Sequence, residues 1–274
     1  MLGGSSYDPF PAGPQVTGSE ADGQVAGPPA RLLLTEPARG LAGLALLPLA
    51  AGWLASAPRG DGHGVLVLPG LLASDMSTAP LRLYASWLGY TVRGWELGRN
   101  VGPTDTVLAD LPRAVTDLAG STGGSVSIIG WSMGGIYARE LAREQPDQVR
   151  QVITLGSPFR LTDPRQSRAD SAYRRRSHLH ATGHPVPTRE QVARPIDVPS
   201  TAVYSRQDGI VSWQACIEPE AGAHQNVEVR CGHLGFGIDP ATLWVIADRL
   251  AAPAGPRHPF RAPPALRSLY PGNR

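Results

Sequence analysis

A serine lies between glycines at the point where a strand pattern gives way to a helical pattern, in the stretch SIIGWSMGG from Ser127 to Gly135. A strand that turns abruptly into a helix crowds its own backbone, so the flanking positions must lack side chains. Such a G-x-S-x-G corner exposes its central residue at the carboxyl end of the strand, beside a helix N-terminus. The pattern predicts that Ser132 is a nucleophile, and a glycine-rich turn with a capping serine is the alternative.

Strand and helix patterns alternate on both sides of this corner. Short apolar runs predict strands at VLVLPG, YTVRGWEL, SVSIIG, VRQVITLG, STAVYS and NVEVRC. Helical patterns cover residues 80–88, 104–118, 133–145 and 240–251, and Pro112 is expected to kink or divide the second of them. This rhythm predicts an α/β fold with a mostly parallel central sheet and helices on both faces.

The chain of 274 residues is expected to hold one main domain over residues 60–251. The alternation breaks over about 159–198, which predicts a cap inserted into that domain. Residues 1–30, rich in Gly, Pro, Ser and Ala, are expected to be disordered, and 31–59 to form a helical segment on the core. The Pro- and Arg-rich residues 252–274 are expected to be an extended wrap or a flexible end.

An uncharged apolar run covers residues 41–57, and Pro48 interrupts it. The run is short for a membrane span, so a helix laid over the core is expected, with a membrane-associated segment as the alternative. No positively charged region followed by an apolar core marks a secretory signal, which favours the cytoplasm. Export is the alternative if Cys216 and Cys231 form a disulfide.

Charge and composition exclude several kinds of chemistry. The formal net charge is only +2, which gives no reason to expect a nucleic acid partner. All 25 basic residues are arginine, so no lysine is present to form a Schiff base or to grip phosphates in a P-loop. The cap stretch HLHATGH has no accompanying cysteine or carboxylate cluster, and no metal site is expected.

A serine nucleophile needs an imidazole that takes its proton and a carboxylate that fixes the imidazole tautomer. Asp208, in YSRQDGIV, and His233, in CGHLGFG, each follow a predicted strand. Because the carboxyl ends of parallel strands meet at one edge of a sheet, both residues are expected beside Ser132. None of the acids and histidines of the cap follows a strand in the required order (Asp163, Asp170, Asp197, His178, His180 and His184).

These three motifs, taken in chain order, resemble the α/β-hydrolase family and look most like its bacterial lipases and esterases. The resemblance covers roughly Gly60 to Leu250. It implies that Ser132 is the nucleophile, Asp208 the orienting acid and His233 the general base and then acid, with no metal or organic cofactor.

The resemblance also implies an oxyanion hole built from two backbone N–H groups, those of Met133 and Leu71. Pro69 stands where the family often has histidine in the loop that carries Leu71. Leu72 is expected to form part of an apolar wall for substrate. Two further aromatic residues are expected to pack in the core, and a place at the substrate-binding pocket border is the alternative for each (Trp131 and Trp213).

Cys216 and Cys231 are the two cysteines of the chain. One follows the loop of Asp208 and the other precedes His233 by two residues. A disulfide would hold these two loops in register, and two buried thiols are the alternative.

Together these features predict a serine carboxylic ester hydrolase that forms an acyl-enzyme on medium-chain acyl esters. The expected partner is a small-molecule or lipid ester, with transient contact to a lipid surface. An acyltransferase or thioesterase with the same triad, or a non-catalytic binding protein with this fold, is the alternative.

Overall fold

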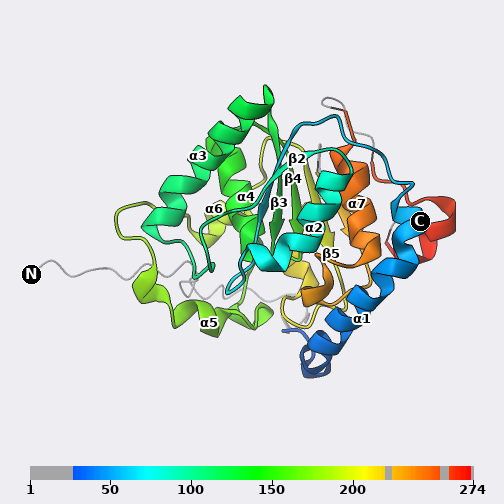
Figure 1. The fold of residues 1–274 in the computed structure, drawn as a ribbon. Helices are drawn as coiled ribbons and strands as arrows, with labels where there is room; N and C mark the ends of the chain where they lie inside the picture. The colour runs from blue at the N-terminus through cyan, green and yellow to red at the C-terminus, as the bar shows by residue number, and fades with distance from the viewer. Residues whose placement is uncertain (1–26, 220–223, 254–258, 273–274) are drawn as a thin grey trace, which may run out of the picture.

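A sheet of parallel strands runs through the centre of the protein (Figure 1). The structure is a computed structural model that describes residues 27–219, 224–253 and 259–272. Within these ranges the strand order is β2-β1-β3-β4-β5-β6, and every neighbouring pair is parallel. The strands are β1 (Gly64–Leu68), β2 (Thr91–Arg93), β3 (Val126–Trp131), β4 (Val149–Leu155), β5 (Ser200–Tyr204) and β6 (His224–Glu228). The predicted α/β fold with a parallel sheet is confirmed.

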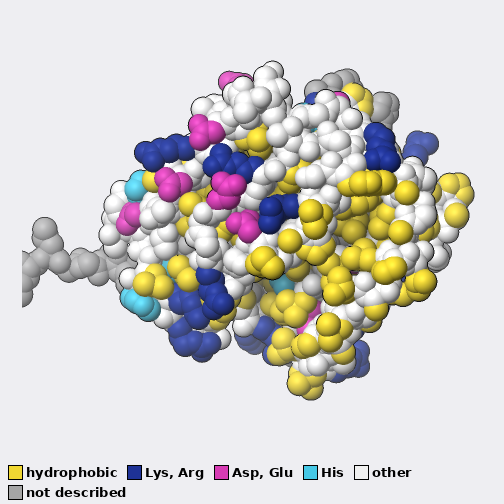
Figure 2. All heavy atoms as spheres, viewed as in Figure 1, with side chains coloured by type: hydrophobic (Ala, Val, Ile, Leu, Met, Phe, Trp, Pro, Cys, Tyr) yellow, Lys and Arg dark blue, Asp and Glu magenta, His cyan; other side chains and the backbone are white. Residues whose placement is uncertain are grey.

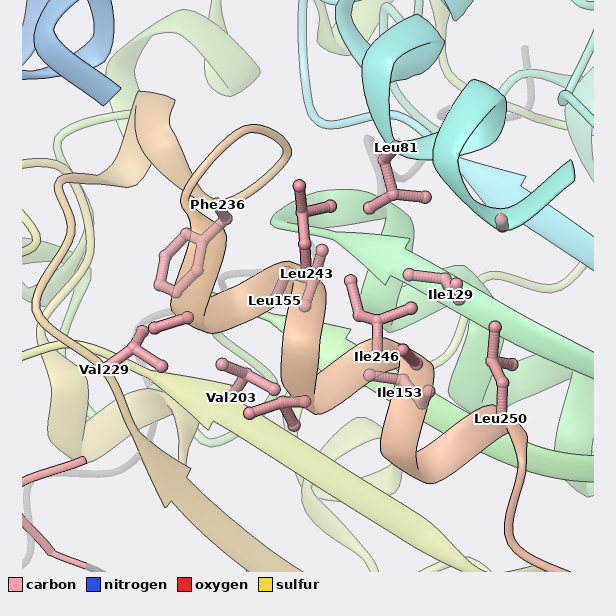
Figure 3. Packing of buried hydrophobic residues seen from close by; sticks show 14 of the residues in the cluster. Leu81, Ile129, Ile153, Leu155, Val203, Val229, Phe236, Leu243, Ile246 and Leu250 are labelled. Atoms are coloured by element: carbon pink, nitrogen blue, oxygen red, sulfur yellow. The ribbon is translucent and has the colours of Figure 1, made fainter. Parts of the chain in front are cut away.

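Helices cover both faces of the sheet, and the central strands β1 and β3 are therefore buried along their whole length. On one face α3 (Asp105–Thr122) and α4 (Met133–Glu144) pack on side chains such as Leu66 and Ile128. On the other face α2 (Asp75–Trp87) and α7 (Pro240–Leu250) pack on the alternate residues. Figure 3 shows Leu243, Ile246 and Leu250 of α7 directed at the strands.

The predicted cap lies between β4 and β5 and contains short helices instead of strands. These are α5 (Asp170–Arg174) and α6 (Arg189–Ala193), with 3-10 helices at Pro164–Gln166 and Ser177–Leu179. Arg143 of α4 donates to the carbonyls of Val192 and Arg194 and so fastens the end of the cap to the main domain.

An N-terminal helix, α1 (Ala30–Leu54), precedes the sheet and lies beside α7 (Figure 1). Its buried residues are only Glu36, Ala50 and Leu54, so most of its surface faces outward. Figure 2 shows apolar side chains gathered over this helix, and four of its leucines are at least half exposed (Leu34, Leu41, Leu46 and Leu49). By length and composition α1 is able to span a membrane, with a mean hydropathy of 1.3 in its most apolar window.

The expected helix over residues 31–59 therefore begins one residue earlier and ends at Leu54, and it covers the core along one side only. Disorder was expected for residues 1–30, and residues 1–26 of this segment lie outside the described ranges. At the other end of the chain, Phe260 and Tyr270 are buried, and the Tyr270 hydroxyl donates to the Ala241 carbonyl at 3.0 Å. The described part of the tail thus wraps onto α7.

Pro112 does not divide α3, which continues from Asp105 to Thr122. A proline removes one helical N–H bond, but the buried side chains of Leu111 and Val115 hold the flanking turns on the sheet. Gln145 donates its side-chain amide to the Pro112 carbonyl at 3.1 Å.

A buried ion pair joins α4 to the segment between β5 and β6. Arg139 and Glu218 are each at most 1% exposed and hydrogen-bond to one another. The Ser200 hydroxyl also donates to Glu218 at 2.7 Å, and the Arg139 guanidinium lies 4.0 Å from the centre of the Phe159 ring. Because both charges are out of water, each depends on the other for its solvation.

We expect Glu218→Ala to lower the free energy of unfolding by about 3–5 kcal/mol, since it leaves the Arg139 guanidinium buried without its partner. Urea unfolding followed by circular dichroism measures the change. The exposed pair Arg113 and Asp110 supplies a control, because Asp110→Ala is expected to cost less than about 1 kcal/mol. Equal effects of the two substitutions would contradict the assigned importance of the buried pair.

Candidate active site

The strand–helix corner predicted from the sequence is present at Ser132. Strand β3 ends at Trp131, α4 begins at Met133, and Ser132 between them has a φ of 53°. This left-handed conformation is strained for a residue with a side chain. A Cβ atom at Gly130 would lie 2.4 Å from the backbone of Gly134, so the corner closes only with glycine there.

The loops that follow β5 and β6 bring the predicted acid and histidine into contact. Asp208 Oδ2 lies 2.6 Å from His233 Nδ1, and both side chains are buried. Asp208 Oδ1 accepts the backbone N–H groups of Ile210 and Val211 at 2.8 and 2.7 Å. These bonds fix the carboxylate, which in turn orients the ring and leaves Nε2 free for a proton acceptor role.

The corner of Ser132 and the loop of His233 meet at the same edge of the sheet. The Trp131 indole donates to the His233 carbonyl at 3.1 Å and joins the two segments directly. Within the described ranges, no hydrogen bond joins the Ser132 hydroxyl to the His233 ring. Such bonds often tighten only when substrate is bound. The Asp208–His233 contact is therefore formed, and transfer of a proton from Ser132 stays a prediction.

The electrostatic surroundings favour a charged form of His233. Burial by itself lowers the pKa of the ring, but the charge and the hydrogen bond of Asp208, together with the charge of Glu36, raise that pKa above its ordinary value of 6.5. A base with such a pKa holds a proton firmly once it has taken one.

The two predicted oxyanion donors are the backbone N–H groups of Leu71 and Met133. Among the described residues, no acceptor takes the N–H of Leu71 or of Met133. A Cβ atom at Gly70 would lie 3.1 Å from the Ser132 Cβ, which shows how closely the Leu71 loop approaches the serine. The two amides are thus available as donors beside the Ser132 hydroxyl.

Asn100 holds this loop in place, a role that was not predicted from the sequence. It is fully buried, and its side-chain amide donates to the Pro69 carbonyl at 2.9 Å. Its backbone carbonyl accepts the Leu72 N–H at 2.7 Å, and its backbone N–H donates to Ala73 at 2.8 Å. An asparagine after a short strand is too common a feature to single out in a sequence.

Two neighbouring apolar cavities lie near Ser132, between α4 and the cap, and the larger of them also reaches α3. A small recess next to Ser132 shares Met133, Ile136, Pro158 and Tyr173 with a larger cavity. The larger cavity contains about 830 Å³ of empty space, part of it open to solvent. Its inner lining comes mainly from aliphatic and aromatic residues (Leu108, Leu111, Leu141, Phe159, Val186 and Val192).

The three predicted substrate-binding residues lie outside both of these cavities. Leu72 is partly exposed with a φ of 65°, and Trp131 is packed in the core. Trp213 stacks on Tyr204 at 5.7 Å, and the Arg206 guanidinium covers its ring at 4.0 Å. Both tryptophans thus have the packing role that the sequence favoured.

Cys216 and Cys231 are buried free thiols, so of the two alternatives that the sequence left open, the disulfide is not formed. Burial, with a further contribution from nearby carboxylates, raises the pKa of both thiols. The loops of Asp208 and His233 are held in register by a hydrogen bond instead, since the Ser205 hydroxyl donates to the Cys231 carbonyl at 2.6 Å.

A second serine–histidine–aspartate chain lies at the opposite edge of the sheet. His63 is 2.5 Å from Asp61 through Nδ1 and 2.8 Å from the Ser127 hydroxyl through Nε2. Ser127 has no exposed surface, and the Gln151 amide already donates to its oxygen at 3.2 Å. This serine is therefore inaccessible to a substrate, and its hydrogen bonds to His63 and Gln151 link β3 to its neighbours. It provides an internal comparison for Ser132.

Solved structures with a similar fold include several hydrolases. An alpha/beta superfamily hydrolase from Oenococcus oeni PSU-1 matches at a TM-score of 0.52 and 18% identity, over 69% of this chain and 92% of that one. The chain has the α/β-hydrolase fold. Aspergillus fumigatus lipase B matches at a TM-score of 0.53 and 16% identity, over 74% of this chain and 56% of its own.

A third structure with the α/β-hydrolase fold, the putative non-heme bromoperoxidase BpoC from Mycobacterium tuberculosis H37Rv, matches at a TM-score of 0.50 and 16% identity, over 70% of this chain and 92% of that one. No family model matches the sequence, and no curated protein matches it. At these identities the similarity establishes the α/β-hydrolase fold, and the chemistry has to be argued from the site.

For this α/β-hydrolase-fold protein we expect ester-hydrolysing activity to decrease as the pH is lowered, with the midpoint of this decrease above pH 6.5. A general base must be unprotonated, and the surroundings of His233 raise its pKa, so activity rises with pH through that value. The dependence of kcat/KM on pH, measured for an activated ester, reports this group in the free enzyme. A midpoint at or below 6.5 in protein that circular dichroism shows to be folded would contradict the assignment.

Proposed function

We propose that the protein is a serine hydrolase that cleaves carboxylic esters through an acyl-enzyme. The observation that carries the proposal is the buried Asp208–His233 contact at the sheet edge where the strained Ser132 lies. The two unoccupied N–H groups of Leu71 and Met133 support it, because they are the donors that a tetrahedral oxyanion requires.

In the proposed reaction the Ser132 Oγ attacks the ester carbonyl carbon while His233 Nε2 takes the hydroxyl proton. The tetrahedral oxyanion accepts hydrogen bonds from Leu71 and Met133. The C–O bond to the alcohol then breaks, and His233 returns its proton to the leaving oxygen. Water, deprotonated by His233, attacks the acyl-enzyme in a second cycle and releases the acid and the free serine.

The apolar cavity favours a medium-length acyl chain over acetate. Met133 and Ile136 border both the recess at Ser132 and the larger cavity, so a chain bound to the serine has a continuous apolar path. Burying each methylene there contributes about 0.8 kcal/mol, which makes affinity rise with chain length until the cavity is full. A small-molecule or lipid ester is the proposed substrate class.

The first test compares Ser132→Ala with Ser127→Ala. We expect Ser132→Ala to reduce p-nitrophenyl butyrate hydrolysis at least about 10⁴-fold, because no other side chain supplies the attacking oxygen. Ser127→Ala is expected to keep full activity and to lose about 1–2 kcal/mol of stability, since His63 and Gln151 lose a buried partner.

A fluorophosphonate probe gives an independent measurement, with the labelled peptide identified by mass spectrometry. Ser132 is expected to carry the label in the wild type and in Ser127→Ala. Retained turnover in folded Ser132→Ala, or labelling at another serine, would reject the proposal. Addition of a primary alcohol to the assay separates hydrolysis from acyl transfer, because a transferase forms the new ester as its main product.

The second test changes the depth of the acyl cavity. Leu108 lines the large cavity and not the recess at Ser132, so Leu108→Trp is expected to shorten the preferred acyl chain without slowing acetate hydrolysis. Leu108→Met, which nearly conserves volume, is the control. Rates for p-nitrophenyl esters from acetate to dodecanoate give the comparison. A wild-type maximum at acetate, or an unchanged profile in Leu108→Trp, would count against this cavity as the acyl site.

A further inference from the structure

Glu36 is a buried carboxylate of α1, far from the triad in sequence but in contact with its loops. The residue is 1% exposed, although most of its helix faces outward. Its Oε1 accepts the Gly209 N–H at 2.7 Å and the His233 N–H at 2.9 Å, and its Oε2 accepts the Leu234 N–H at 3.0 Å. One side chain therefore joins the residue after Asp208 to His233 itself.

The backbone around these bonds leaves little room for movement. A Cβ atom at Gly209 would lie 2.5 Å from the α1 backbone at Leu32 and Leu33, and one at Gly232 would lie 2.6 Å from Glu36 Oε2. Both loops thus pack directly on α1 through glycines. A displacement of Glu36 would move the two loops relative to each other, and with them the Asp208–His233 contact.

Burying a carboxylate is costly unless hydrogen bonds replace its water. Glu36 meets that cost with three backbone donors and the Arg39 guanidinium, which lies 2.8 Å from Oε1. Arg39 also donates to the carbonyls of Leu32 and Gln207. An apolar residue would attach α1 to the domain as well, so a charge at this position suggests a role beyond attachment.

We propose that Glu36 is a positioning residue, which fixes the loops of Asp208 and His233 against each other and places a second negative charge behind the imidazole. The proposal rests on the proposed serine hydrolase function and adds a residue from outside the sheet to it. Glu36 touches neither substrate cavity, and it acts only through the backbone and the field at His233.

The charges that face His233 come from two directions. Asp208 approaches from the loop after β5, and Glu36 approaches from α1 with Arg39 beside it. Burial is the largest single influence on His233 and lowers its pKa, but Asp208 and then Glu36 together raise the pKa by more. Removal of the Glu36 charge, which also leaves the Arg39 cation uncompensated, shifts the balance toward the neutral ring.

The test compares Glu36→Gln and Glu36→Asp in the full-length protein. Glu36→Gln is expected to lower kcat by about 10- to 100-fold, the size expected for loss of a hydrogen bond to a charged group, with little change in KM. Its acid limb in kcat/KM is expected to move to lower pH by about half a unit or more. Glu36→Asp shortens the side chain, so its hydrogen bonds to the loops weaken and kcat is expected to fall. Because Glu36→Asp keeps the negative charge, its acid limb is expected to stay near that of the wild type.

Asp75→Asn is the matched control. Asp75 also accepts two backbone N–H groups, those of Trp95 and Glu96 at 2.9 Å each, but it does not act on His233. The acid limb of kcat/KM in this variant is expected to stay at the pH of the wild type, even if the variant is less stable. Thermal unfolding of each variant and fluorophosphonate labelling of Ser132 show that the protein is folded and that its serine is present.

A folded, labelled Glu36→Gln with the kcat and acid limb of the wild type would overturn the proposal. If Glu36→Gln fails to fold, an unchanged kcat in Glu36→Asp overturns it instead. These outcomes differ from failure of the proposed function, which shows as retained turnover in Ser132→Ala whatever residue occupies position 36.

Discussion

Parallel alignment of the strands is the constraint on which the site depends. Because β3, β5 and β6 all run in the same direction, the residues that follow them emerge at one edge of the sheet. Ser132, Asp208 and His233 are far apart in the chain and share only this property. The helices on both faces hold the inner strands in place, since β1, β3, β4 and β5 contribute side chains to the packed core on each side.

The direction of the strands does not by itself determine the conformation of the loops that follow them. Hydrogen bonds from buried polar groups determine that conformation. Asn100 fastens the Leu71 loop, Ser205 joins the loops that follow β5 and β6, and Glu36 holds those same two loops from α1. Each group has its hydrogen bonds satisfied, as burial demands. The comparison with Ser127 shows that hydrogen bonds between serine, histidine and aspartate are not sufficient, because a fully buried serine cannot reach a substrate.

Much of this arrangement follows from local sequence patterns. Alternating strand and helix periods predicted the fold, and the glycines at 130 and 134 predicted the corner because only a residue without a side chain fits there. The order of strand ends also placed Asp208 and His233 correctly at the edge of the sheet. Other expectations were wrong or incomplete: Pro112 does not interrupt α3, and Cys216 and Cys231 remain thiols.

The sequence by itself therefore determined the sheet, its direction and the residues that reach its edge, since these depend on periodicity and on steric limits between neighbours in the chain. Only the tertiary structure decided which buried side chains fasten the loops, how the cap and α3 enclose an apolar cavity, and that the outer face of α1 is exposed. Glu36 illustrates the reason. Its partners in the two loops, Gly209 and His233, lie more than 170 residues away, and a hydrogen bond over that separation leaves no periodic signal in the chain.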